Sequence, residues 1–156
     1  MSAVAAAEIG SVEWASYEAH YGDGSGIGEA LRDLLDSTDF DSAADAWDRL
    51  EDHVFSQGTI YSVAEPTVSV LLAALTEEQP AWRAGRIVDL LFFVVDGASV
   101  ADLMLQERCR ARAREGFWLL VSYALQHDGW ARENVIEVLE VVAPERIAGL
   151  RDALSE

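Results

Sequence analysis

The sequence predicts an all-α fold in a single domain. Apolar residues recur mostly at the 3.6-residue spacing of an amphipathic helix, the 156 residues include only three prolines, and about half of the residues are apolar. A chain of this length buries roughly 70% of its unfolded surface, so its core needs neither a disulfide nor a metal. We therefore expect residues 1–156 to form one helical domain without a cofactor.

The expected helices are separated by short polar or glycine-containing turns. The first is expected at residues 12–20 with Ser11 as its N-cap, before a glycine-rich loop at 22–28. The others are expected at 27–35, at 40–55, in a segment ending at 75, at 80–95, in a helical pattern from a Ser99 cap to 126 that breaks near 115–116, at 130–142, and at 145–154. The segment ending at 75 has two possible starts: a capping box of Ser62 and Glu65, or Pro66 as first helical residue.

Three segments repeat the same order of elements. In each, a leucine-rich helix ends, a polar turn follows and a second amphipathic helix begins; the leucines Leu35, Leu75 and Leu125 lie 40 and then 50 residues apart. The pattern resembles HEAT-type repeats, whose period is about 40–47 residues. Because one helix pair cannot bury its apolar face alone, neighbouring pairs stack. We expect a short HEAT-like α-solenoid of about three helical pairs, with an inserted or lengthened helix in the last unit.

A second resemblance is local and covers about the first 75 residues. Trp14, Tyr17 and the His20-Tyr21-Gly22 segment, then Gln57-Gly58-Thr59-Ile60-Tyr61 and Pro66, resemble a group of short bacterial HEAT-repeat-like proteins. The chain departs from that group at its Gly-Asp-Gly-Ser-Gly loop, where a nearby proline is typical. Some members of the group look like immunity proteins of toxin loci, so the resemblance implies binding rather than catalysis.

The charge of the chain excludes several partners. The chain has 28 acidic residues, 11 arginines and no lysine, which gives a formal net charge of −17. Binding to nucleic acid is disfavoured because affinity for phosphate depends on cationic side chains, and an anionic membrane surface would repel the protein. No apolar stretch approaches the roughly 20 residues of a membrane span. We expect a cytoplasmic protein that binds neither nucleic acid nor membrane.

Two expected helices carry an acidic stripe. Asp41, Asp45, Asp48 and Asp52 follow the spacing i, i+4, i+7 and i+11, which places all four on one side of a helix, and Glu133, Glu137 and Glu140 repeat the spacing near the C-terminus. Like charges at this spacing oppose helix formation by about 0.2–0.5 kcal/mol per pair. The stripes therefore have two interpretations: a solvated surface of an acidic protein, or a surface kept for a partner.

The segment between the two stripes is apolar nearly all round. Residues 81–95 include Trp82 and Phe93, and a central helix buried on two sides explains this composition. The alternative is that Trp82 or Phe93 reaches the concave surface and forms an apolar anchor inside an acidic rim. The arginines at 108, 110, 112 and 114 are expected mainly to form internal ion pairs, and Cys109 among them to be a structural thiol.

The sequence contains no catalytic or metal-binding motif, so we expect a protein that is not an enzyme. The first hypothesis is a protein-binding module of the immunity or antitoxin type, whose acidic concave surface (Asp41, Asp45, Asp48, Asp52, Trp82, Glu133, Glu137 and Glu140) occludes a basic partner such as a nuclease toxin. The second is an adaptor or scaffold that binds a peptide or helix without any toxin. A HEAT-like DNA glycosylase is the enzymatic alternative, but it needs a basic groove. The oligomeric state does not follow from the sequence.

Overall fold

A computed structural model describes residues 1–155, and over that range the protein is all-α, as the sequence predicts. Its helices are α1 (Ala3–Ser11), α2 (Ile27–Asp36), α3 (Phe40–Val54), α4 (Ala64–Ala74), α5 (Ala81–Asp96), α6 (Leu105–Glu115), α7 (Phe117–Gln126), α8 (Trp130–Val142), α9 (Pro144–Ala148) and α10 (Arg151–Ser155). A 3-10 turn, η1 (Trp14–Ser16), lies between α1 and α2, and a short hairpin of β1 (Phe55–Ser56) and β2 (Thr59–Ile60) joins α3 to α4.

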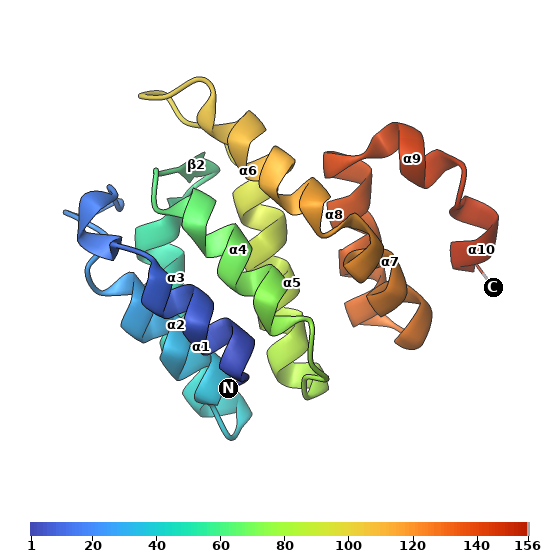
Figure 1. The fold of residues 1–156 in the computed structure, drawn as a ribbon, viewed down its shortest axis with the longest axis horizontal. Coiled ribbons are helices and arrows are strands. Elements are labelled where there is room, and N and C mark those ends of the chain that lie inside the picture. Colours follow the sequence, from blue (N-terminus) through green and yellow to red (C-terminus); the bar gives the residue numbers. More distant parts are fainter. Residues whose placement is uncertain (156) are drawn as a thin grey trace.

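The helices form two layers (Figure 1). One layer contains α1, α4 and the consecutive helices α6 and α7, since α1 packs against α4 and α4 against α6. The other contains α3, α5 and α8 in that order, with α2 packed against α3. Contacts of α4 with α5 and of α7 with α8 join the layers. Fully buried leucines, among them Leu71, Leu90 and Leu120, fill the space between them.

The hairpin confirms the expected break after α3. Phe55 pairs with Ile60 and Ser56 with Thr59, so the turn has two residues, Gln57 and Gly58. Their φ angles are 49° and 80°, and two positive values in succession are what a type I′ hairpin turn requires. Just after the hairpin, the Tyr61 hydroxyl forms a hydrogen bond with Nδ1 of His20 and so links this turn to the segment before α2.

The prediction for the N-terminus was wrong. The first helix is Ala3–Ser11, where alanines give strong helix propensity, and its N-cap is Ser2, whose Oγ accepts a hydrogen bond from the Ala5 N–H at 3.0 Å. Ser11 ends this helix instead of capping the next one. Residues 12–20 contain only the turn η1, because their backbone bonds to other segments: the Glu18 N–H donates to Ser62 Oγ at 2.8 Å.

Three further boundaries differ from the prediction. Helix α4 begins at Ala64, before Pro66, and neither expected start holds, since Ser62 Oγ is occupied by Glu18. Ser99 Oγ accepts from the Asp102 N–H and so closes a turn in the loop before α6, which begins only at Leu105. The expected helix at 145–154 is split into α9 and α10 around Gly149.

The three expected repeats do not pack alike. Leu35 and Leu75 are buried as the repeat predicts, but Leu125 is 55% exposed. Between Leu75 and Leu125 the chain forms α5 and then two helices, α6 and α7, which meet at Gly116. This extra helix accounts for the longer interval, and the predicted break near 115–116 is confirmed. Among the described residues, no helix is both long and apolar enough to cross a bilayer.

Candidate partner-binding face

The outward sides of α3, α5 and α8 carry strips of exposed and half-buried side chains, which we call the α3–α5–α8 face. On α5 the strip follows the same i, i+4, i+7, i+11 spacing as the acidic stripe of α3, while most of the rest of that helix is buried. Since α5 contacts both α3 and α8, the three helices lie side by side, and Arg86 over Phe40 and the Asp89–Asn134 hydrogen bond link the strip of α5 to its neighbours. The face consists of Phe40, Asp41, Asp45, Asp48 and Asp52 of α3, Trp82, Arg86, Asp89 and Phe93 of α5, and Trp130, Glu133, Asn134, Glu137 and Glu140 of α8.

The acidic stripe of α3 is exposed as its spacing predicts. All four aspartates lie on the surface, opposite the buried residues Ala43, Ala46, Trp47, Leu50 and Val54. Within residues 1–155 none of the four forms an ion pair. Arg49, the one arginine on α3, instead pairs with Asp33 of α2 at 2.6 Å. The negative charge of the stripe therefore has no neutralising partner within the described chain.

The stripe of α8 is exposed as well, but one of its three members is used internally. Glu133 and Glu137 lie on the surface and take no ion pair among the described residues. Glu140 accepts a hydrogen bond from Arg151 of α10 at 3.0 Å. Trp130, at the first position of α8, lies directly on Gly85 of α5, where a Cβ would collide with its ring. The glycine thus lets α8 and its stripe approach α5 closely.

Aromatic side chains lie between the two acidic stripes. Phe93 of α5 is 43% exposed and stacks on Phe55, with ring centroids 4.8 Å apart. Phe40 at the start of α3 is 56% exposed, and the Arg86 guanidinium lies 5.5 Å from its ring centroid and 5.2 Å from that of Trp47. Trp82 is half-buried against the core. Phe93 therefore reaches the surface as the alternative interpretation of this segment requires, whereas Trp82 does so only in part.

Asp89 is the acidic residue of the face whose pKa is most strongly changed by its environment. Its carboxylate accepts a hydrogen bond from Asn134 Nδ2 at 2.7 Å, which links α5 to α8. Partial burial raises the pKa of Asp89 to about 6, Arg86 opposes the rise, and Glu137 adds to it. A carboxyl group held at such a cost is more frequent at functional sites than elsewhere. Sequence reasoning missed Asp89, Asn134 and Arg86, although a charged pair at i and i+3 within an apolar helix was a usable signal.

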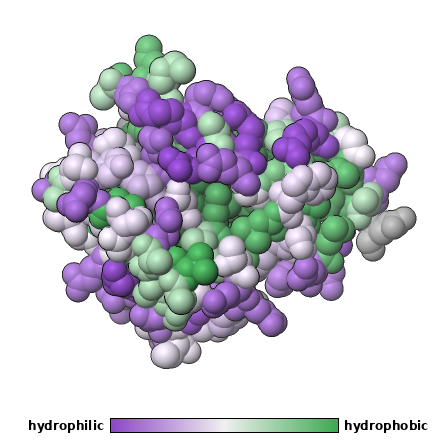
Figure 2. All heavy atoms as spheres, in the orientation of Figure 1, coloured by the Kyte–Doolittle hydropathy of each residue, from purple (hydrophilic) through white to green (hydrophobic). Residues whose placement is uncertain are grey.

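Outside this face, the thiol and the arginines singled out from the sequence are buried or paired. Cys109 is buried, and burial raises the pKa of its thiol to about 12, so it is a structural thiol. The arginines around it form ion pairs, as expected: Arg108 pairs with Glu65 and Asp102, and Arg114 with Glu107. Figure 2 shows hydrophilic side chains gathered over the region of α6. No group of three or more metal-ligating side chains gathers within residues 1–155.

The α3–α5–α8 face, as we define it, contains the acidic residues of both stripes and five residues that the sequence did not indicate. The residues of the two acidic stripes, Trp82 and Phe93 were named from the sequence; Phe40, Arg86, Asp89, Trp130 and Asn134 were not. Their positions depend on how three helices meet, which a single helical pattern does not reveal. No family model matches the chain, and comparisons with curated proteins and with solved structures give no match.

Proposed function

We propose that the protein is a non-catalytic binding module that recognises a basic protein through the α3–α5–α8 face. In this proposal the helical pairs form a short HEAT-like solenoid and the face is its concave surface. One observation carries the proposal: six carboxylates without an ion pair among the described residues flank a strip of exposed aromatic side chains. Aromatic anchors surrounded by a polar rim are the usual composition of protein-binding surfaces.

The two parts of the face would contribute differently to binding. Unneutralised carboxylates attract a basic partner over a distance and so raise the association rate and the specificity. Phe93, Phe40 and Trp130 supply apolar area at the centre, where desolvation gives most of the affinity. Arg86 and Asp89 are positioned to exchange their present contacts for charged groups of the partner. Such a face does not suit nucleic acid, whose phosphates the carboxylates would repel.

The most specific form of the proposal is an immunity or antitoxin protein. A nuclease toxin must attract phosphate and is therefore basic at its active site. An acidic face that covers such a site would neutralise the toxin without any catalysis. The local resemblance to immunity-like HEAT proteins supports this form, while the charge and aromatic content of the face support a basic protein partner in general. A cytoplasmic location goes with the proposal.

The test is affinity capture followed by charge reversal. The immobilised wild-type protein is exposed to lysate of its native organism at 50 and 300 mM salt, and the basic protein retained at low salt is identified and purified. We expect the triple variant Asp45→Lys, Asp48→Lys, Glu137→Lys to bind it about 100-fold more weakly and with a smaller salt dependence, since each reversed contact costs on the order of 1 kcal/mol.

A matched control has the same change in net charge at other sites. In the variant Glu13→Lys, Glu115→Lys, Glu145→Lys, all three positions are exposed and lie outside the face. The proposal requires that this control keep an affinity within about threefold of wild type. Equal losses in the two triple variants would mean that total charge, and not this face, attracts the partner.

A further inference from the structure

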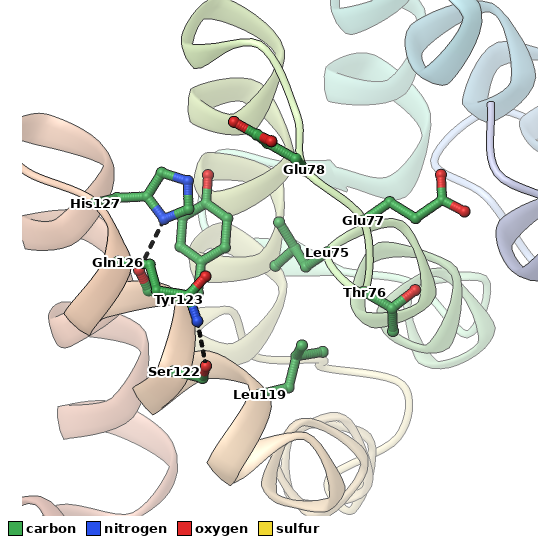
Figure 3. Close-up of a pocket in the computed structure, with 9 residues that line it drawn as sticks. All are labelled: Leu75, Thr76, Glu77, Glu78, Leu119, Ser122, Tyr123, Gln126 and His127. Atoms are coloured by element: carbon green, nitrogen blue, oxygen red, sulfur yellow. Dashed lines mark hydrogen bonds between the residues drawn. The ribbon is translucent and has the colours of Figure 1, made fainter.

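A pocket of about 320 Å³ lies between the turn that joins α4 to α5 and one side of α7 (Figure 3). Its lining is mostly polar and comes from the turn after α4 and from α7 with the residue that follows it: Leu75, Thr76, Glu77, Glu78, Leu119, Ser122, Tyr123, Gln126 and His127. None of these residues belongs to the α3–α5–α8 face. The pocket is therefore a second site, independent of the function proposed above.

Tyr123 places an unsatisfied hydroxyl group in the wall of this pocket. The side chain is only 5% exposed, and within the described chain its buried oxygen has no hydrogen-bond partner. Figure 3 shows the hydroxyl pointing past the imidazole of His127 toward the side of the pocket where Glu78 lies. Burial also raises the pKa of Tyr123, so the group stays protonated. A buried hydroxyl without a partner is costly, which points to a ligand that completes it.

The neighbouring polar groups are mostly acceptors. The rings of His127 and Tyr123 stack with centroids 3.9 Å apart, and His127 Nδ1 is 2.8 Å from the Tyr123 carbonyl oxygen. Since a carbonyl can only accept, Nδ1 carries a proton and donates it to this oxygen. Two donors beside it are engaged: one N–H of Gln126 donates to Ser122 Oγ, and the Thr76 hydroxyl donates to a backbone carbonyl.

The charge of the pocket is negative and unbalanced. Glu77 and Glu78 are exposed at its edge, and neither pairs with a basic side chain within residues 1–155. The lining contains no arginine. Leu75 and Leu119 supply an apolar wall between the polar groups. The pocket therefore complements a ligand that is positively charged, rich in N–H donors and partly apolar.

We propose that this pocket binds a compact organic cation, an ammonium or guanidinium group on a short apolar stem. The cationic head would lie between Glu78 and the Tyr123 hydroxyl, to which its N–H groups donate the missing hydrogen bond. The stem would lie against Leu75 and Leu119. The same chemistry is offered by a free small amine and by the side chain of a basic residue from another protein, and the experiment separates these two sources.

Binding is measured by two-dimensional NMR on the full-length ¹⁵N-labelled protein. We expect n-butylguanidinium and n-butylammonium to cause saturable shifts at the amides of the pocket residues, with Kd values near or below about 1 mM, and neutral n-butanol to bind at least tenfold more weakly. Equal binding of n-butanol and the cations, or shifts without saturation, would overturn the proposal. A blocked Gly-Arg-Gly peptide that binds as tightly as n-butylguanidinium identifies the source as a protein side chain; weaker binding of the peptide identifies it as a free molecule.

Two variants link the binding to the pocket chemistry. Tyr123→Phe and Glu78→Gln should each raise the Kd for n-butylguanidinium about tenfold, the effect of losing one hydrogen bond or charge contact in a partly desolvated site. The control Glu13→Gln removes an equal charge from an exposed residue away from the pocket and should leave the Kd unchanged. Tyr123→Phe removes an unsatisfied group, so its fold is expected to persist, and Glu78→Gln tests the site without touching the core. Wild-type affinity in both variants would refute the proposal.

Discussion

Removing the charge of Asp89 is expected to stabilise the protein at neutral pH. The substitution Asp89→Asn keeps an oxygen that can accept the hydrogen bond from Asn134 and removes the negative charge of the carboxylate. The ordinary pKa of 3.8 rises to about 6 in the folded protein, mainly because the group is partly desolvated. The folded state thus binds this proton more tightly than the unfolded state does, and the protonated form favours folding.

The sign and size of the effect follow from this shift. The stabilisation by protonated Asp89 is complete below about pH 4 and is lost as the pH rises through 6. A shift of about two units corresponds to about 3 kcal/mol at 1.36 kcal/mol per unit. Because the side chain is only half-buried, solvent screening reduces this to about 1 kcal/mol. Asp89→Asn should therefore be about 1 kcal/mol more stable than wild type at pH 7.5 and equally stable near pH 4.

The assay is urea unfolding of both proteins at the two pH values, with equal m-values as the check that only stability has changed. In thermal unfolding the same difference corresponds to about 2–4 °C for a chain of this size. Glu13→Gln serves as control, because it removes one negative charge from an exposed residue with no ion pair among the described residues. A gain from Asp89→Asn that is the same at both pH values, or that Glu13→Gln reproduces, would refute the assignment of the cost to desolvation of Asp89.

Three further outcomes are expected. Ser2→Ala should lower the free energy of unfolding by about 1 kcal/mol because Ser2 caps α1, while Ser11→Ala should change it by less than about 0.5 kcal/mol. Urea unfolding measures both variants, and equal effects would contradict the observed cap. Gly58→Ala should destabilise by about 1–2 kcal/mol because its φ of 80° is unfavourable for an L side chain, and no loss of stability would contradict that geometry. Cys109 should react with a thiol reagent only as fast as the protein unfolds, and rapid labelling of the native protein would contradict its burial.

Local patterns in the sequence were sufficient where one helix decides its own boundaries. The helix at 130–142 and the break at 115–116 were predicted from periodicity and glycine alone, and the structure has both. The predicted helix at residues 12–20 was wrong. The backbone of this segment instead forms tertiary hydrogen bonds, such as that of the Glu18 N–H with Ser62 Oγ, which a local pattern does not reveal. The side of α3 that carries the aspartates was predictable from their spacing. Its neighbour Arg86 and the Asp89–Asn134 bond were not, because they require the order in which helices pack.

The placement of the arginines bears on why the face is acidic. Eleven arginines could have been interspersed with the acidic stripes, where each would have relieved part of the like-charge cost of about 0.2–0.5 kcal/mol per pair. Instead, Arg83, Arg110, Arg114 and Arg132 donate to backbone carbonyls, and Arg49, Arg108 and Arg112 pair with acidic residues outside the face.

Within residues 1–155, Arg86 is the one arginine on the α3–α5–α8 face, and it lies over Phe40 and Trp47 while the aspartates have no ion pair. Solubility alone requires a net charge but does not require that cations be kept away from the stripe of α3, whereas on α8 Arg151 pairs with Glu140. The uneven distribution therefore favours a surface that acts on a partner. Equal net charge in the two triple variants makes this difference measurable, since only a local role predicts that they bind differently.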